Sequence, residues 1–289
     1  MSGRLLILGG TGMLGHQLWA QARERDAFVT VRGSVPPGPA DLFRDDRVIE
    51  GVDAYDVASA ETALDRVSPK VVVNCIGLVK QLPEGKLPVP TLMINALFPQ
   101  RLAELCRARH IRLIHVSTDC VFSGNAGPYT EQSSPDADDF YGRTKLLGEV
   151  AAPGCLTLRT SIIGRELRSA HALVDWFLLQ AGRQVQGYRH ALFTGLTTVE
   201  LSRAILRVVD DFPALEGLYQ VASDPVSKFD LLHLLARHYG TSVTIEPADE
   251  PRIDRRLDGT RFRTATGYVA PSWDTMIAEL AGARHWRQA

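Results

Sequence analysis

A glycine-rich turn near the start of the sequence limits the possible folds more than any other feature. The apolar run 5–8 (LLIL) is followed by GGTGMLG, in which Gly9, Gly12 and Gly15 are three residues apart. Residues 13–22 then place apolar side chains near one face of a helix. Glycines between a strand and a helix let the backbone approach the pyrophosphate of a dinucleotide at the positive end of the helix dipole. The sequence therefore predicts a dinucleotide-binding turn, and a plain connecting turn is the alternative.

Apolar runs and amphipathic stretches alternate from this turn to about residue 164. The stretches in which we expect strands are 4–10, 27–33, 70–77, 111–119 and 155–164. They are nearly continuous in Val, Ile and Leu, which is typical of strands that are covered on both faces in a parallel sheet. The alternation with helices predicts an α/β fold with a Rossmann-type, doubly wound parallel sheet.

The pattern loosens in the last part of the chain. Helix-like stretches there are 169–182, 197–212, 227–240 and 272–282, with short apolar runs between them. We therefore predict a dinucleotide-binding domain over 1–164 and a smaller C-terminal α/β substrate-binding lobe over 165–289. The run 217–222 is expected to return a strand from this lobe to the main sheet.

The composition argues against several classes of function. The formal net charge is −1 and charges of both signs are interspersed, so neither a nucleic-acid nor a membrane-surface role carried by bulk charge is expected. No apolar run reaches the roughly 20 residues that cross a bilayer, and the first residues do not have the layout of a secretory signal. The four cysteines have no C-x-x-C spacing and the eight histidines form no metal pattern. We therefore predict free thiols in the cytoplasm and no metal.

Arg32 follows the second expected strand, in the turn VTVRGS. An acidic residue in this turn usually binds the ribose 2′-hydroxyl of NAD, whereas an arginine suits the 2′-phosphate of NADP. The turn contains no acidic residue. The sequence therefore favours NADPH/NADP as the cofactor, with NADH still possible, and a solvated surface arginine is the alternative.

Two groups of polar residues predict the chemistry. Ser117, Thr118 and Asp119 end the fourth expected strand, at the sheet edge where ligands of open α/β sheets bind. Tyr141 and Lys145 stand four residues apart at the entrance to a helix. Hydride transfer to a ketone needs a proton donor, and an ammonium one helical turn away is expected to lower the pKa of a tyrosine for that role. The alternatives are capping by the first group and a solvated helical turn for the second.

In this order, the glycine turn, the hydroxyl at the strand end and Tyr-x-x-x-Lys resemble the extended short-chain dehydrogenase/reductase superfamily. The closer resemblance is to the dTDP-4-dehydrorhamnose reductase family of nucleotide-sugar 4-keto reductases. It is carried by LILGGTGMLG, MINALFPQRLAELC, HVSTDCVFSG, GPYTEQSSPDADDFYGRTKLLGE and LRTSIIG, and it covers nearly the whole chain. The resemblance implies NADPH-dependent reduction of the C4 ketone of a dTDP- or UDP-linked 4-keto-6-deoxy sugar, in deoxysugar or surface-polysaccharide biosynthesis.

The resemblance also implies the residues around each ligand. The catalytic residues are Thr118, which polarises the carbonyl, Tyr141 and Lys145, with Asp119 in the proton relay or holding the loop. The cofactor contacts are Gly9, Thr11, Gly12, Met13, Leu14, Gly15, Arg32, Asp53, Ala54, Cys75, Ile76, Gly77, Asn95, Tyr141 and Lys145, and Asn95 also helps to order the lysine. The substrate contacts are Val79, Lys80, Thr118, Ile163 and Arg165. Family members often have other residues at Cys75, Ile76 and Cys120, and these departures leave the sugar open.

Other interpretations stay open at this point. A nucleotide-sugar epimerase or 4,6-dehydratase would keep a tightly bound NAD, and Arg32 weighs against it. The chain could also be a non-catalytic regulatory subunit that binds the cofactor, like the family's relative that regulates methionine adenosyltransferase. Such a subunit would not need the full set of catalytic residues. The segment 254–262 has three arginines, which fit either a diphosphate site or a solvated charged face. Helices at 91–109 and 140–152 are candidates for a homodimer interface.

Overall fold

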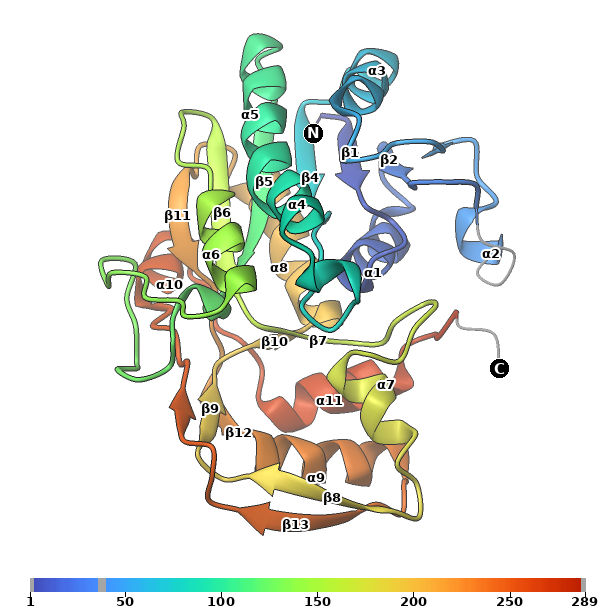
Figure 1. Ribbon diagram of the computed structural model, residues 1–289. Helices are drawn as coiled ribbons and strands as arrows, with labels where there is room; N and C mark the ends of the chain where they lie inside the picture. Colours follow the sequence, from blue (N-terminus) through green and yellow to red (C-terminus); the bar gives the residue numbers. More distant parts are fainter. Residues whose placement is uncertain (1–2, 36–39, 287–289) are drawn as a thin grey trace.

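A parallel sheet forms the centre of the computed structural model, which describes residues 3–35 and 40–286 (Figure 1). Its seven strands within this part of the chain run in the order β11-β6-β5-β4-β1-β2-β3, and every neighbouring pair is parallel. The strands are β1 (Leu5–Leu8), β2 (Ala27–Thr30), β3 (Val48–Ile49), β4 (Val71–Asn74), β5 (Arg112–Thr118), β6 (Cys155–Thr160) and β11 (Gly217–Gln220). The order reverses between β1 and β4, where doubly wound sheets bind their ligands. The predicted fold class is confirmed.

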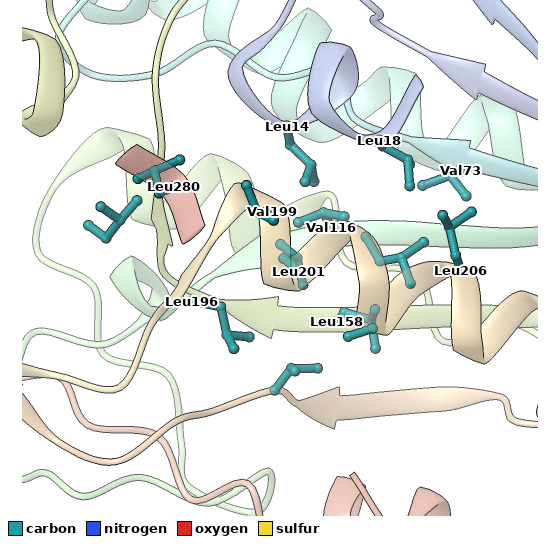
Figure 2. Packing of buried hydrophobic residues seen from close by; sticks show 14 of the residues in the cluster. Leu14, Leu18, Val73, Val116, Leu158, Leu196, Val199, Leu201, Leu206 and Leu280 are labelled. Atoms are coloured by element: carbon teal, nitrogen blue, oxygen red, sulfur yellow. The ribbon is translucent and has the colours of Figure 1, made fainter. Parts of the chain in front are cut away.

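Helices cover both faces of this sheet, which explains the unbroken apolar runs of its strands. Leu5 and Ile7 of β1 point into a core with α1 (Met13–Ala22) and α8 (Thr198–Asp211). Leu6 and Leu8 point into a second core with α3 (Val57–Val67) and α5 (Phe98–Ala108). Figure 2 shows part of the first core, with side chains of α1 and α8 meeting those of the sheet. Each fully buried leucine contributes about 1.5–3 kcal/mol, so both faces help to fix the register of β1.

The helix that precedes β5 is interrupted by a wider turn. It consists of α4 (Pro88–Thr91), a π-helical turn (Leu92–Leu97) and α5. Pro99 follows that turn, and a proline ring clashes with the carbonyl four residues before it in a regular α-helix. The π-helical turn places the carbonyl of Asn95 differently and thereby relieves this clash. Its second effect is to direct Asn95 toward the loop after β4, as described below.

The C-terminal lobe lies beyond the carboxyl edge of the sheet, below it in Figure 1. Its small sheets pair β8 with β13, β7 with β10, and β12 with β9 and β14. Their bounds are β7 (Ile162–Ile163), β8 (Gln184–Tyr188), β9 (Ala191–Phe193), β10 (Leu196–Thr197), β12 (Val226–Ser227), β13 (Thr244–Ala248) and β14 (Ile253–Asp254). The remaining helices are α2 (Ala40–Phe43), α6 (Phe140–Leu147), α7 (Leu173–Leu178), α9 (Lys228–Tyr239), α10 (Thr260–Thr266) and α11 (Trp273–Gly282). A division of the chain at residue 164 stays a prediction, because β11 and α8 from beyond it pack with the main sheet.

No helix within residues 3–35 and 40–286 is both long enough and apolar enough to span a bilayer.

Candidate active site

The glycine turn after β1 can exist only with glycines at two of its positions. Gly9 has a φ of +84°, in the left-handed region. A Cβ on Gly15 would lie 2.1 Å from the carbonyl oxygen of Gly9, so the first turn of α1 rests directly on the backbone of the loop. Gly12 stands at the N-cap of α1 and makes no side-chain cap. Because glycine has no side chain, nothing at the N-cap position caps the first backbone N–H groups of α1. A pyrophosphate site requires such uncapped N–H groups.

The neighbouring turn after β4 forms the second wall. A Cβ on Gly9 would lie 2.9 Å from Cγ1 of Ile76 and 3.2 Å from the carbonyl carbon of Cys75, so the two turns are in contact. A Cβ on Gly77 would lie 3.5 Å from Oδ1 of Asn95 and 3.8 Å from Nζ of Lys145. The structure therefore brings the predicted cofactor contacts from three parts of the chain together.

Asn95 fixes the loop after β4. Its side-chain carbonyl accepts a hydrogen bond from the backbone N–H of Leu78 (2.8 Å), and its amide donates to the carbonyl of the same residue (2.9 Å). Asn95 was predicted to help order Lys145. In the structure the two side chains have in common that both lie close to Gly77. No hydrogen bond joins the two side chains among the bonds of the described residues.

The remaining cofactor candidates lie along the same edge. Arg32 is exposed directly after β2, and the backbone N–H of Val52 donates to the carbonyl of Val31 (3.1 Å), which sets Asp53 beside that turn. The Asp53 carboxylate accepts from the backbone N–H of Tyr55 (3.0 Å). Four further residues are candidates for cofactor contact. Thr11 and Met13 are half-buried, and Leu14 and Ala54 are buried. Figure 2 shows the Leu14 side chain in the core, so only its backbone faces the turn.

The catalytic candidates meet at the end of β5. The hydroxyl of Thr118 donates to Oδ1 of Asp119 (3.1 Å) and accepts from the backbone N–H of Cys120 (3.1 Å). Helix α6 begins at Phe140, and the carboxylate of the preceding Asp139 caps it by accepting from the N–H of Gly142 (2.6 Å). This cap sets the direction of the helix that carries Tyr141.

Gly142 is a functional position that the sequence did not reveal. A Cβ there would lie 2.1 Å from the carbonyl oxygen of Cys120. Tyr141 can therefore approach Thr118 only because the residue after it has no side chain. A glycine directly after the tyrosine was a visible signal, but it acquires meaning only once α6 is known to pack on the turn after β5.

Lys145, one helical turn after Tyr141, is buried and held by the sheet. Its ammonium donates to the carbonyl of Val116 (2.8 Å), and the residue is only 6% exposed. Burial lowers the pKa of Lys145 to about 8, although the Glu149 carboxylate opposes the shift. Glu149 accepts in turn from Arg159 (2.6 Å) and from the hydroxyl of Ser117 (2.7 Å). The ion pair with Arg159 fixes the position of Glu149. No pattern in the sequence indicated this pair.

The expected lowering of the Tyr141 pKa by Lys145 is not present in this structure. Burial of the phenol raises the pKa of Tyr141 above its usual value, and the Cys120 thiol adds to the rise. A hydrogen bond with Thr118 acts in the opposite direction. The loss of solvation and the acidic groups nearby therefore outweigh this hydrogen bond, and Tyr141 holds its proton at neutral pH.

Asp119 and Lys80 lie near these residues, on the turn after β5 and on the loop after β4. Asp119 is buried, and burial raises the pKa of its carboxyl group, while the charge of Arg255 is the largest opposing influence. Lys80 and Val79 are exposed in the loop after β4, and the Lys80 ammonium lies 3.6 Å from the carboxylate of Asp139. The loop thus reaches the N-terminus of the helix that carries Tyr141.

The other two substrate candidates are placed differently. Ile163 is buried in β7 and belongs to the main core. Arg165 donates to Asp175 (2.8 Å), and it lines a small cavity with His16 and Gln17 of α1. The structure therefore places Arg165 against α1, with its charge neutralised by a buried carboxylate.

Within the described residues, no group of three or more His, Cys, Asp or Glu side chains could hold a metal ion.

The pKa of Lys145 gives a testable pH dependence. A lysine with a lowered pKa loses its charge as the pH rises through about 8, so the Lys145 ammonium, one helical turn from Tyr141, is present below that pH. We expect kcat/KM for ketone reduction to fall above pH 8 with one apparent pKa near that value. Initial rates between pH 6 and 10 with NADPH in excess measure this, and a profile that is flat to about pH 9.5 would show that the ammonium is not required.

Comparison with known proteins bears on this arrangement. A family model described as the RmlD substrate binding domain matches residues 3–284. The chain belongs to this family. The resemblance inferred from the sequence is thereby confirmed.

Individual members of the family are distant from this chain. A dTDP-4-keto-6-deoxy-D-glucose reductase from Streptomyces niveus is 35% identical over 152 residues, which are 52% of this chain and 48% of that protein, so the chain spans about half of its length. A dTDP-4-dehydrorhamnose reductase from Mycobacterium tuberculosis is 26% identical over 313 aligned positions, covering 100% of this chain and 91% of the relative. The crystal structure of a dTDP-4-dehydrorhamnose reductase from Bacillus anthracis in complex with NADP superposes with a TM-score of 0.79 at 18% identity, over 97% of this chain and 99% of that one. This last similarity is evidence for the fold.

Proposed function

We propose that this protein is an NADPH-dependent oxidoreductase that reduces the C4 ketone of a dTDP- or UDP-linked 4-keto-6-deoxy sugar. The observation that carries the proposal is the meeting of Thr118, Tyr141 and Lys145 beside the glycine turn. The reductases from Streptomyces niveus and Mycobacterium tuberculosis, one for each of two dTDP-linked keto sugars, support the choice of substrate class. The nucleotide base and the place in deoxysugar or surface-polysaccharide biosynthesis are part of the same proposal.

The residues present fit a nicotinamide dinucleotide. Gly9 and Gly15 keep the turn after β1 close to the start of α1, and the exposed Gly12 leaves space above it. Asp53 and Ala54 would face the adenosine, and the turn Cys75–Ile76–Gly77 would lie along the middle of the cofactor. When bound there, the cofactor supplies the hydride.

The side chains of this site account for the movement of the proton. Tyr141 keeps its proton at neutral pH because its pKa is raised, so it can donate that proton to the C4 oxygen as negative charge develops there. The Lys145 ammonium, positive below about pH 8, stabilises the phenolate that remains. Thr118 would donate its hydroxyl hydrogen bond to the ketone oxygen in place of Asp119.

Arg32 is proposed to bind the 2′-phosphate of NADPH. Replacing it in Arg32→Gln removes a charge-assisted hydrogen bond, which is worth about 1.5–3 kcal/mol, so we expect KM for NADPH to rise about 10- to 100-fold. KM for NADH should change less than twofold, because NADH has no phosphate at that position. The matched control is Arg101→Gln, an exposed arginine on α5, and it should leave both values unchanged. Equal loss for both cofactors would refute the assignment of Arg32.

The nucleotide carried by the purified protein separates the competing functions. A reductase is expected to bind NADPH reversibly and to consume it when a keto sugar is added. An epimerase or dehydratase would arrive with stoichiometric NAD and show no net consumption. A regulatory subunit would bind NADPH without turnover of any keto sugar.

We also propose a homodimer in the cytoplasm. Val89, Leu92, Leu97 and Leu147 are exposed apolar side chains on α4, the π-helical turn and α6. The π-helical turn and α6 pack side by side, so the four form one candidate interface. Light scattering of the purified protein measures the mass directly. The cytoplasmic location is supported by the four free thiols.

A further inference from the structure

The three arginines of the segment 254–262 have different surroundings in the structure. Arg256 forms a two-pronged ion pair with Asp254, at 2.6 and 2.8 Å. The guanidinium of Arg261 lies over the ring of Tyr219 at 4.4 Å and donates to the carbonyl of Leu218 (3.0 Å). Of the three side chains, that of Arg255 reaches the segment after β5, where its Nε donates to the carbonyl of Phe122 (2.9 Å).

The backbone around Arg255 is fixed to that segment. The N–H of Asp254 donates to the carbonyl of Gly124 (2.7 Å), and the N–H of Arg255 donates to the carbonyl of Leu192 (2.9 Å). A Cβ on Gly124 would lie 3.2 Å from Cγ of Arg255, so the arginine stem runs along this glycine. In Figure 1 the green segment after β5 lies close to the orange-red segment that leads into α10. The position of Arg255 is therefore set by the joining of the two lobes.

Arg255 is close to the reacting groups. The short 3₁₀ turn Asp119–Val121 connects Thr118 to Phe122, and the N–H of Phe122 donates to the carbonyl of Asp119 (3.0 Å). Burial raises the pKa of Asp119, and two positive charges oppose that rise: Arg255, and Lys80 from the loop after β4. Two cations from opposite lobes thus act on the turn that follows Thr118.

The guanidinium of Arg255 keeps donors for a ligand. Within residues 3–35 and 40–286, the carbonyl of Phe122 is its one hydrogen-bond acceptor, and no carboxylate lies within 4.0 Å of it. A guanidinium has five N–H donors in a planar fork that matches the oxygens of a phosphate. In a nucleotide sugar the diphosphate is attached at C1, across the pyranose ring from C4. A sugar whose C4 ketone meets Thr118 and Tyr141 therefore extends its diphosphate away from them, and Arg255, held at Phe122 beyond the turn, is a candidate to receive it.

We propose that Arg255 binds the diphosphate of the nucleotide-sugar substrate, with Lys80 supporting it from the opposite lobe. This inference rests on the proposed function, since it names the residue that distinguishes a nucleotide-linked keto sugar from a free one. Arg256 is paired with Asp254, and Arg261 lies over the ring of Tyr219. The segment therefore offers one arginine to a phosphate and not three.

Calorimetric titration with dTDP and with UDP tests the site in the full-length protein saturated with NADPH. We expect Arg255→Met to weaken binding of the nucleoside diphosphate about 10- to 100-fold, the loss typical of a hydrogen-bonded charge. Arg261→Met is the matched control and should bind as the wild type does. NADPH affinity should stay within twofold in both variants, which also shows that they are folded. Arg255→Lys keeps the charge but not the fork, so it should lose about tenfold or less, and it replaces the methionine variant if that one does not fold.

The outcomes separate this inference from the proposed function. If Arg255→Met binds dTDP and UDP as tightly as the wild type, or if the wild type binds neither, Arg255 is not a diphosphate ligand. If binding depends on Arg255 but the protein reduces no keto sugar, the inference stands and the proposed reaction does not. If keto sugars are reduced and KM is unchanged in Arg255→Met, the reaction stands and the inference fails.

Discussion

Tyr141→Phe is expected to abolish ketone reduction while leaving the cofactor site intact. The substitution removes one hydroxyl, and with it the proton that the proposed reaction delivers to C4. General acid catalysis is typically worth 10²- to 10⁴-fold, so we expect kcat to fall by at least about 100-fold. Neither NADPH affinity nor the unfolding temperature should change much, because the ring remains in place.

The control for this prediction is an exposed tyrosine. Tyr55 is 44% exposed, so Tyr55→Phe should leave kcat unchanged. Stopped-flow measurement of NADPH oxidation with saturating keto sugar gives kcat for both variants, and calorimetry gives their NADPH affinity. If Tyr141→Phe keeps more than about a tenth of the wild-type kcat, another group is the acid.

Gly15→Ala is expected to destroy the cofactor site through one methyl group. The added Cβ would lie 2.1 Å from the carbonyl oxygen of Gly9. The position of a Cβ is fixed by its own backbone and the oxygen belongs to the backbone of the turn, so no side-chain rotation relieves the clash. Either α1 or the turn must shift, which removes the backbone N–H groups from the pyrophosphate site. We expect a loss of about 1–3 kcal/mol in the free energy of unfolding, and NADPH affinity at least 100-fold lower.

Gly282→Ala is the matched control for this overpacking. A Cβ at Gly282 meets no atom within 4 Å, and the residue ends helix α11, far along the chain from the turn. It should be neutral or slightly stabilising, because alanine favours helix more than glycine does. Urea unfolding followed by circular dichroism gives the free energy of unfolding for both variants. Wild-type NADPH binding by Gly15→Ala would mean that the pyrophosphate does not sit on this turn.

Local patterns were sufficient to predict the fold and the strand–turn–helix unit at its start. Strand β1, the glycine turn and α1 are consecutive in the sequence, so their residue types and spacing define the unit without knowledge of tertiary contacts. The parallel sheet follows from runs such as Val71–Asn74, which are buried on both faces. The candidate trio also lay in recognisable segments, and its predicted catalytic role awaits the experiments above.

Features that depend on distant contacts were missed. The pKa of Tyr141 moved in the opposite direction to the prediction, because spacing reveals a neighbouring charge but not the loss of solvation around the phenol. The role of Gly142 depends on the carbonyl of Cys120, and that of Arg255 on the carbonyl of Phe122. The sequence showed three arginines in one segment and could not separate them, since their partners come from other elements.

The stoichiometry of NADPH oxidation tests the central claim most directly. The purified protein would be given NADPH and a limiting amount of enzymatically generated dTDP-4-keto-6-deoxyglucose, its 5-epimer or the UDP-linked equivalent, with NADH run in parallel. The account predicts that one of these sugars consumes one NADPH per molecule and yields a 6-deoxyhexose reduced at C4, faster with NADPH than with NADH. If NADPH binds but none of the keto sugars consumes it, the account of this protein as a 4-keto sugar reductase is wrong, and the tyrosine–lysine pair serves a different purpose.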